Sequence, residues 1–146
     1  MTTFIVGGAT SHTGSVLADV LERRGAPFVV GARNPATAPK NHKAVRFDWT
    51  DPTTFDAPFQ ASPDIDRIYF MPPSIFRPLP VTKPFIDYAA SKGVKRFVFL
   101  GATIFENDGS GTLTGSVWEY IANLGVEYTV LRPTWFIGKP FSYILV

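Results

Sequence analysis

Hydrophobic residues in this sequence fall into short continuous runs, which alternate with stretches where apolar positions recur at helical spacing. Three of the helical stretches end at a glycine (Gly25, Gly93 and Gly125), and an apolar run begins within four residues of each. The runs are apolar throughout instead of alternating with polar residues, which is typical of parallel strands covered on both faces. The predicted strands are residues 4–6, 28–30, 45–47, 68–71, 97–100 and 128–131. The pattern therefore predicts an α/β fold, a Rossmann-like doubly wound parallel sheet of about six strands.

Helices are predicted between these strands from the spacing of apolar side chains. The first runs from Thr13 to Arg24. Asp51 followed by Pro52 predicts the N-cap and first turn of a short helix through Phe59. Two later helices each carry one apolar face, formed by Val81, Phe85, Tyr88 and Ala89 in the first and by Val117, Ile121 and Leu124 in the second.

The composition limits what such a chain can do. The 146 residues are 45% hydrophobic, and 14 basic against 12 acidic residues give a net charge of +2. A balance this close, without a cluster of Lys and Arg, argues against a nucleic-acid partner. Cysteine is absent and the only histidines are His12 and His42, so we expect no disulfide and no metal site. Because no leader-like or membrane-spanning segment is evident, we expect one cytoplasmic domain, residues 1–146, without a membrane partner.

A glycine-rich turn follows the first predicted strand and opens the first predicted helix. Doubly wound sheets bind their ligands at this position, where a helix N-terminus directs N–H groups outward. The turn favours a dinucleotide bound by Gly8, Thr10, Ser11, His12, Thr13 and Gly14. Ser11 takes a place that is ordinarily glycine, so its Cβ is expected either to weaken cofactor binding or to displace the cofactor slightly, although its hydroxyl could donate to a phosphate oxygen. A tight connection without a ligand is the alternative interpretation.

The residues after the second predicted strand indicate which dinucleotide is bound. NAD-binding domains place a carboxylate there, about 20 residues past the turn, to bind the ribose diol. Here Arg33 lies 19 residues past Gly14 with no carboxylate nearby, and a guanidinium suits a 2′-phosphate. We therefore predict NADP(H) as the cofactor, with an ordinary solvated turn arginine as the alternative.

Residues after the other strands complete the predicted cofactor site, because ligands of such sheets bind at the carboxyl ends of the strands. Asp48 and Trp49 are placed to meet the adenine, the carboxylate at the exocyclic amine and the indole beside the ring. Core packing is an equal alternative for Trp49. The remaining candidates are Met71, Pro72, Gly101 and Ala102.

Several segments resemble the NmrA-like atypical short-chain dehydrogenases. They are the glycine turn and residues 31–34, 47–49, 83–87, 93–98 and 125–136. The last segment, which contains Leu-Arg-Pro-Thr-Trp-Phe, is similar to the fungal ergot-alkaloid reductases, the festuclavine and agroclavine dehydrogenases. The resemblance implies NADPH-dependent reduction of an iminium carbon in a small alkaloid-like substrate, with the hydride supplied by the nicotinamide.

The sequence departs from this family in ways that bear on catalysis. The family is longer, and its second half contributes much of the substrate pocket. Residues 115–118 read Gly-Ser-Val-Trp where the family has a Lys and a His, and residues 101–103 replace a Ser-Ala-Ser. No catalytic residue is therefore assigned, and two alternatives to a reductase stay open: a non-catalytic NADP(H)-binding sensor and an inactive truncated product. The apolar residues from Trp135 to Val146 predict a surface covered by a homodimer partner or another subunit.

Tyr88 and Lys92 match the Tyr-x-x-x-Lys signature of short-chain dehydrogenases, in which the lysine activates the tyrosine for proton transfer. That signature belongs on the helix after the fifth strand, whereas this pair precedes the strand at 97–100. Tyr88 also falls on an apolar helix face, so helix packing is the favoured interpretation.

Overall fold

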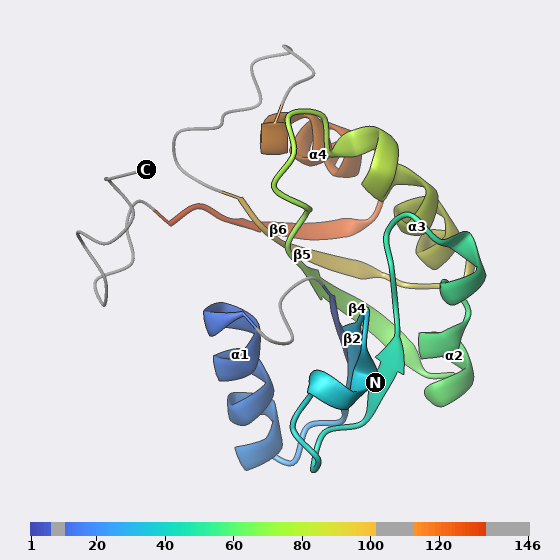
Figure 1. Ribbon diagram of the computed structural model, residues 1–146. Coiled ribbons are helices and arrows are strands. Elements are labelled where there is room, and N and C mark those ends of the chain that lie inside the picture. The colour runs from blue at the N-terminus through green and yellow to red at the C-terminus, as the bar shows by residue number, and fades with distance from the viewer. Residues whose placement is uncertain (7–10, 102–112, 134–146) are drawn as a thin grey trace.

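The computed structural model describes residues 1–6, 11–101 and 113–133, which form helices around one parallel sheet (Figure 1). The strands are β1 (Thr2–Val6), β2 (Phe28–Ala32), β3 (Ala44–Arg46), β4 (Ile65–Phe70), β5 (Arg96–Leu100) and β6 (Glu127–Leu131). The helices are α1 (His12–Arg23), α2 (Ala57–Ala61), α3 (Leu79–Ser91) and α4 (Leu113–Ala122). Two short 3-10 turns are η1 (Pro35–Thr37) and η2 (Pro52–Thr54). Each predicted strand overlaps an observed one.

The sheet order is β3-β2-β1-β4-β5-β6, and every neighbouring pair is parallel. The chain builds outward from β1 to β3 and then crosses back to β4 on the other side of β1. Phe4 in β1 aligns with Val29 in β2 and with Ile68 in β4. Because the order reverses between β1 and β4, the carboxyl ends of these two strands mark the ligand position of a doubly wound sheet. The predicted Rossmann-like fold is confirmed.

The sheet separates two hydrophobic clusters. The larger cluster lies between the sheet and α2, α3 and α4, whereas the smaller cluster lies on the opposite face beneath α1 (Figure 1). Side chains alternate between the two faces along each strand. In β4, Ile68 and Phe70 belong to the larger cluster and Tyr69 belongs to the smaller one.

Phenylalanine supplies much of the larger cluster. Eight of the ten phenylalanines within the described residues are buried, and the ring of Phe85 in α3 lies 4.6 Å from that of Phe47 and 5.2 Å from that of Phe55. Edge-to-face pairs of this kind add roughly 0.5–1.5 kcal/mol each to the stabilisation from burial. The high phenylalanine content is therefore largely a property of the core.

Glycine follows three of the helices, as predicted. Gly25, Gly93 and Gly125 have φ angles of 61°, 90° and 77°, in the left-handed region that favours glycine. An added Cβ would have nothing within 4 Å at any of these positions. The backbone conformation, and not a shortage of space, therefore requires glycine there.

The helix predicted from Asp51 through Phe59 is divided into η2 and α2. Asp51 is the N-cap as predicted, and its Oδ1 accepts from the backbone N–H of Thr53 at 3.1 Å. Pro58 has no N–H to donate to the carbonyl of Thr54, so a continuous helical ladder cannot pass through it. The sequence prediction of one helix was wrong in this respect.

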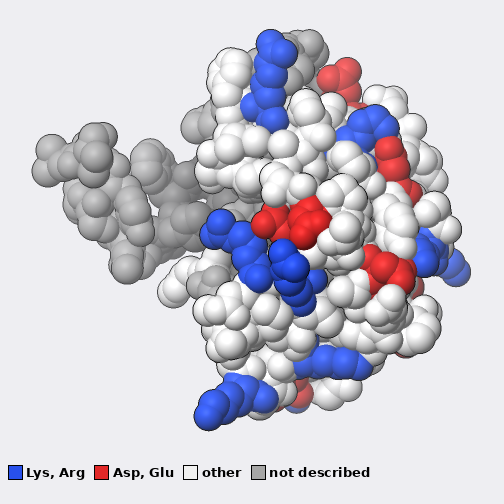
Figure 2. All heavy atoms as spheres, turned by 45° about the vertical axis from the view of Figure 1, so that its right-hand side comes forward, with Lys and Arg blue, Asp and Glu red and all other residues white. Residues whose placement is uncertain are grey.

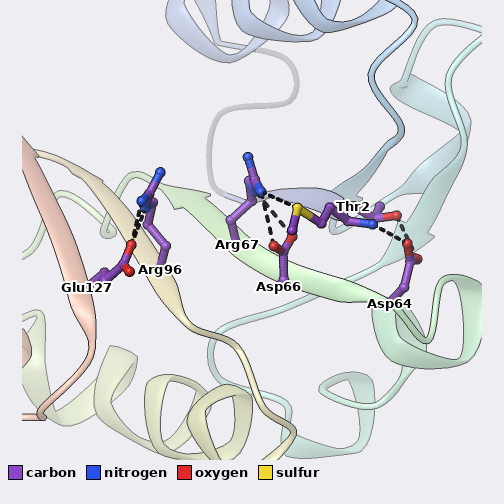
Figure 3. Close-up of polar contacts among 7 residues, drawn as sticks. Thr2, Asp64, Asp66, Arg67, Arg96 and Glu127 are labelled. Carbon is purple, nitrogen blue, oxygen red and sulfur yellow. Dashed lines mark hydrogen bonds and ion pairs between the residues drawn. The ribbon is translucent and has the colours of Figure 1, made fainter.

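Charged side chains line the amino ends of the strands, at the edge opposite the carboxyl ends (Figure 3). Asp64, just before β4, accepts hydrogen bonds from the N-terminal amine and from Thr2 Oγ1, both at 2.7 Å. Arg96 in β5 donates through Nε to Glu127 in β6 at 2.8 Å. Each exposed pair contributes little to stability. Together they join the first residues of neighbouring strands.

Basic and acidic side chains are interspersed over the face shown in Figure 2, and no patch of one sign covers it. This distribution agrees with the net charge of +2. None of the described helices is long and apolar enough to cross a membrane. That the chain has no nucleic-acid partner stays a prediction.

Candidate functional site

The predicted cofactor residues that the structure describes follow the carboxyl ends of five strands. Because parallel strands end at the same edge of a sheet, these residues lie along that edge on both sides of the switch between β1 and β4. They are Ser11, His12, Thr13, Gly14, Arg33, Asp48, Trp49, Met71, Pro72 and Gly101. Gly8, Thr10 and Ala102 lie outside the described residues.

The first turn of α1 is suited to an anion. It contains no acidic residue, and Ser11 is its N-cap. The Oγ of Ser11 accepts a hydrogen bond from the N–H of Gly14 at 3.3 Å. This hydroxyl therefore caps the helix, a role that the sequence interpretation did not assign to it. A helix N-terminus without a nearby carboxylate favours a phosphate through its N–H groups and its dipole.

Tyr69 fixes this first turn to the strand across the switch point. The side chain of Tyr69 is buried in the smaller cluster, and its hydroxyl donates to Thr13 Oγ1 at 3.2 Å. Thr13 Oγ1 also lies 3.5 Å from Ser11 Oγ. Sequence reasoning missed Tyr69, although a tyrosine inside an apolar strand signals a hydroxyl that needs a buried partner.

Arg33 follows the last residue of β2 and is exposed. The N–H of Phe47 donates to the carbonyl of Ala32 at 2.9 Å, which holds the ends of β2 and β3 together. Arg33 and Asp48, the next residues along the two strands, are therefore neighbours at the carboxyl edge. The structure thus places one guanidinium and one carboxylate together at the carboxyl ends of β2 and β3.

The Asp48 carboxylate is oriented by the turn that follows it. Its Oδ1 accepts hydrogen bonds from the backbone N–H of Thr50 at 2.9 Å and from the Thr50 hydroxyl at 2.8 Å. These two bonds are the main reason that the pKa of Asp48 lies below its ordinary value, and the charges of Arg33 and Arg46 lower it further. The Asp48 carboxylate therefore lies close enough to Arg33 to interact with its charge, so the sequence-based statement that Arg33 has no carboxylate nearby was wrong.

Gly31 in β2 is required for packing. A Cβ at this position would lie 2.7 Å from Cζ of Phe4 and 3.1 Å from Cβ of Phe47. Aromatic side chains occupy the space that a larger residue would need. The glycine therefore lets β2 pass close to the core before the chain reaches Arg33.

The indole of Trp49 packs on the larger cluster. Its ring centroid lies 5.1 Å from Phe47, 5.6 Å from Phe85 and 5.9 Å from Phe70. The side chain is only partly buried. These contacts support the packing interpretation of Trp49, and its contact with adenine stays a prediction.

Met71 and Gly101 extend the strand ladders at the carboxyl edge. The N–H of Met71 donates to the carbonyl of Val6 at 3.2 Å, and the N–H of Gly101 donates to the carbonyl of Leu131 at 2.9 Å. Pro72 is buried directly after Met71. The backbone after β4 and β5 is therefore held in line with the sheet.

Tyr88 and Lys92 belong to a structural network away from the carboxyl edge. Both lie in the last part of α3 or just after it, and both contact the Asp56 carboxylate. The Tyr88 hydroxyl donates to Oδ1 at 2.6 Å, and Lys92 Nζ lies 2.8 Å from the same oxygen. Lys92 Nζ is also 5.1 Å from the centre of the Tyr88 ring. This arrangement agrees with the predicted packing role and not with a catalytic pair.

The sequence comparisons agree with this geometry. Residues 8–145 match the family model described as NAD(P)H-binding. The chain belongs to this NAD(P)H-binding family. It is 35% identical over 141 residues to agroclavine dehydrogenase of Claviceps fusiformis, a match that covers 92% of this chain and 47% of the relative. It is 36% identical to festuclavine synthase II of Penicillium roqueforti, covering 92% and 48%. The chain thus spans about half the length of the curated relatives that it matches, and the resemblance to the ergot-alkaloid reductases is confirmed.

Solved structures share the fold of this NAD(P)H-binding family member. The triphenylmethane reductase of Citrobacter sp., complexed with NADP(H), superposes with a TM-score of 0.69 at 19% identity, covering 92% of this chain and 50% of the other. A nucleoside-diphosphate-sugar epimerase of Staphylococcus aureus gives a TM-score of 0.73 at 20% identity, covering 90% and 50%. At these identities the likeness concerns the fold.

Proposed function

We propose that this chain is the cofactor-binding part of an NADPH-dependent oxidoreductase of the ergot-alkaloid reductase type. The observation that carries the proposal is the position of Arg33, exposed at the carboxyl end of β2, on the same edge as the acid-free first turn of α1. Relatives named agroclavine dehydrogenase and festuclavine synthase support the reductase class.

The residues present fit a dinucleotide phosphate. The N–H groups at the start of α1, together with Gly8 and Thr10, would hold the pyrophosphate. The guanidinium of Arg33 would bind the 2′-phosphate through paired, charge-assisted hydrogen bonds. Asp48 and Trp49 would lie beside the adenine, and Met71, Pro72, Gly101 and Ala102 would border the nicotinamide end.

The proposed reaction is the reduction of an iminium carbon in a small alkaloid-like molecule. NADPH supplies a hydride when it is bound. An iminium carbon is already electrophilic, so the protein's contribution is to orient the two reactants and no protein acid is needed.

Titration with NADPH and NADH tests the cofactor assignment. Wild-type protein should bind NADPH more tightly than NADH, and Arg33→Asp should weaken NADPH binding roughly 10- to 100-fold, because hydrogen bonds to a charged group are lost. Lys95→Asp makes the same change in charge at the amino end of β5 and should leave both affinities unchanged. An NADPH preference that survives Arg33→Asp would overturn the assignment.

A second candidate function is binding of NADP(H) without turnover. The observation that favours it is in α4. There, Ser116 and Trp118 stand where the NmrA-like dehydrogenases that the chain resembles have a Lys and a His. Ser116 is buried, and Trp118 packs on the larger cluster with its ring 5.3 Å from Cζ of Arg132. Incubation of the NADPH-bound protein with a cyclic iminium separates the two functions. Oxidation of NADPH supports the reductase, and tight binding without oxidation supports the second function.

A further inference from the structure

Two carboxylates and one imidazole converge between α1 and the connection that leads from β2 to β3. Asp19 and Glu22 lie three residues apart in α1, so they share one face of the helix. His42 lies two residues before β3. One ligand atom from each of the three side chains lies within 4.8 Å of the others. The three side chains thus come from two segments about 20 residues apart in the sequence, α1 and the connection before β3.

His42 is buried, and its Nε2 has no hydrogen-bond partner. Its side chain is only 3% exposed, and Nε2 itself is shielded from solvent. The Oε2 of Glu22 lies 3.6 Å away, which is beyond hydrogen-bonding distance. Buried polar atoms are nearly always hydrogen-bonded, so an imidazole nitrogen whose only polar contact is a carboxylate at ion-pair distance needs an explanation.

Neighbouring groups hold the imidazole and the carboxylate in these positions. The ring of Phe28 packs edge-on against His42 with 5.1 Å between centroids. The backbone N–H of His42 donates to the carbonyl of Pro39 at 2.9 Å. Asn41 Nδ2 donates to Oε1 of Glu22 at 2.8 Å, which leaves Oε2 directed at the imidazole. Metal-binding carboxylates are commonly oriented by an outer hydrogen bond of this kind.

Contrary to the expectation of no metal site drawn from the two histidines in the sequence, we propose that Asp19, Glu22 and His42 bind a divalent transition-metal ion, for which Zn²⁺ is the probe. One imidazole nitrogen and two carboxylate oxygens form a donor set that zinc accepts, whereas Mg²⁺ and Ca²⁺ favour oxygen alone. Ligands about 2.0–2.2 Å from a tetrahedral ion lie about 3.3–3.6 Å apart, so the widest separation in the group must shorten by at most about 1.5 Å. Asp19 and Glu22 are exposed, so their side chains can make this adjustment and water can complete the coordination.

The ion would join α1 to the segment that carries the chain from Arg33 to β3. Bound metal would therefore stabilise the packing of that segment on α1. At a Zn²⁺ concentration about 100 times the Kd, the apparent Tm should rise by about 5–10 °C, because the ion binds the folded state preferentially. The site stands independently of the proposed cofactor function, because its ligands lie in the second half of α1 and before β3.

The experiment uses the full chain after treatment with a chelator. Calorimetric titration with ZnCl₂ and absorption titration with Co²⁺ should each give one equivalent of bound metal. His42→Gln and Glu22→Gln should each weaken binding at least tenfold, and a 100-fold excess of Mg²⁺ should not displace the ion. His12→Gln, at the only other histidine, should leave metal binding unchanged. Zinc should also shift the NMR signal of His42 Nε2 in the wild-type protein.

Three results would overturn the proposal. The first is the absence of one-to-one binding up to 1 mM metal, and the second is binding that both His42→Gln and Glu22→Gln leave intact. The third is binding that His12→Gln abolishes. If circular dichroism shows that His42→Gln does not fold, Glu22→Gln at the exposed carboxylate decides the question together with the His42 NMR shift in the wild-type chain.

Discussion

The hydroxyl of Tyr69 in β4 donates a 3.2 Å hydrogen bond to Thr13 Oγ1 in the first turn of α1. This bond crosses the switch point of the sheet. There, β1 leads into α1, and β4 lies beside β1 on the side opposite β2. The N-terminus of α1 is thereby attached to two strands, through the chain to β1 and through a side chain to β4. Tyr69 is thus a positioning residue for the turn that we propose holds the pyrophosphate.

Removing this hydroxyl should affect both stability and cofactor binding. Tyr69→Phe keeps the ring in the smaller cluster and should lower the free energy of unfolding by about 0.5–1.5 kcal/mol, the ordinary worth of a hydrogen bond. We expect NADPH affinity to fall a few-fold, because the first turn of α1 loses the hydrogen bond that attaches Thr13 to β4. Urea unfolding and NADPH titration measure the two effects. Tyr128→Phe, at an exposed position in β6, is the matched control and should change neither quantity.

A stability loss without any change in NADPH affinity would show that the Tyr69–Thr13 bond supports the fold alone. No change in either quantity would contradict the predicted role of the bond altogether.

Sequence features that act locally were predictable here. Gly25, Gly93 and Gly125 end their helices because each adopts a positive φ, and that requirement depends on the turn itself. The division of the helix after Asp51 was missed, although its cause, Pro58, was also local. The proximity of Arg33 to Asp48 was not predicted, because the sequence analysis found no carboxylate near Arg33 and the two residues meet only where β2 and β3 pair.

Contacts that depend on the order of the strands in the sheet could not be predicted from the hydrophobic pattern. Tyr69 and Thr13 are 56 positions apart, and they meet only because β4 lies directly beside β1. Asp56 as the partner of Tyr88 depends likewise on how α2 packs near α3. The convergence of His42 on α1 depends on the path between β2 and β3, for which no periodic pattern exists.

Gly31 offers a test of core packing near the candidate site. Gly31→Ala places a Cβ 2.7 Å from the Phe4 ring, and we expect it to lower the free energy of unfolding by about 1–3 kcal/mol. At Gly101 the nearest atom to an added Cβ is Phe99 Cε1 at 3.3 Å, so Gly101→Ala should cost less. Urea unfolding of the two variants checks the order, and a larger loss for Gly101→Ala would contradict the argument.

Tyr120 joins α4 to α3 through two charged groups. Lys83 Nζ donates to the Tyr120 hydroxyl at 3.0 Å, and that hydroxyl donates to the carboxylate of Asp87. Lys83 also lies over the Tyr120 ring, 4.6 Å from its centre. We expect Tyr120→Phe to keep the ring contact and to lower the free energy of unfolding by about 0.5–1.5 kcal/mol. Urea unfolding measures this loss, and a variant as stable as the wild type would show that the hydroxyl adds nothing to the helix packing.

The Asp56 carboxylate makes stability depend on pH. It accepts hydrogen bonds from Tyr88 at 2.6 Å and from Gln60 at 2.8 Å, and Lys92 Nζ lies 2.8 Å away. These contacts, Lys92 first, lower the pKa of Asp56 from 3.8 to about 2. Because the folded-state pKa lies below the unfolded one, the carboxylate stabilises the fold fully above about pH 4. That stabilisation is lost as the pH falls toward about 2.

Asp56→Asn isolates the effect of the charge, because the amide oxygen can still accept from Tyr88. We expect this variant to have a lower urea midpoint than the wild type at about pH 7, with the difference shrinking steadily below about pH 4. Lys92→Met is the companion variant, and NMR titration of Asp56 should show its pKa returning toward the ordinary value when the ammonium is removed. If the wild-type and Asp56→Asn midpoints instead stay parallel down to about pH 2, the carboxylate does not carry the acid-sensitive stability of the α2–α3 contact.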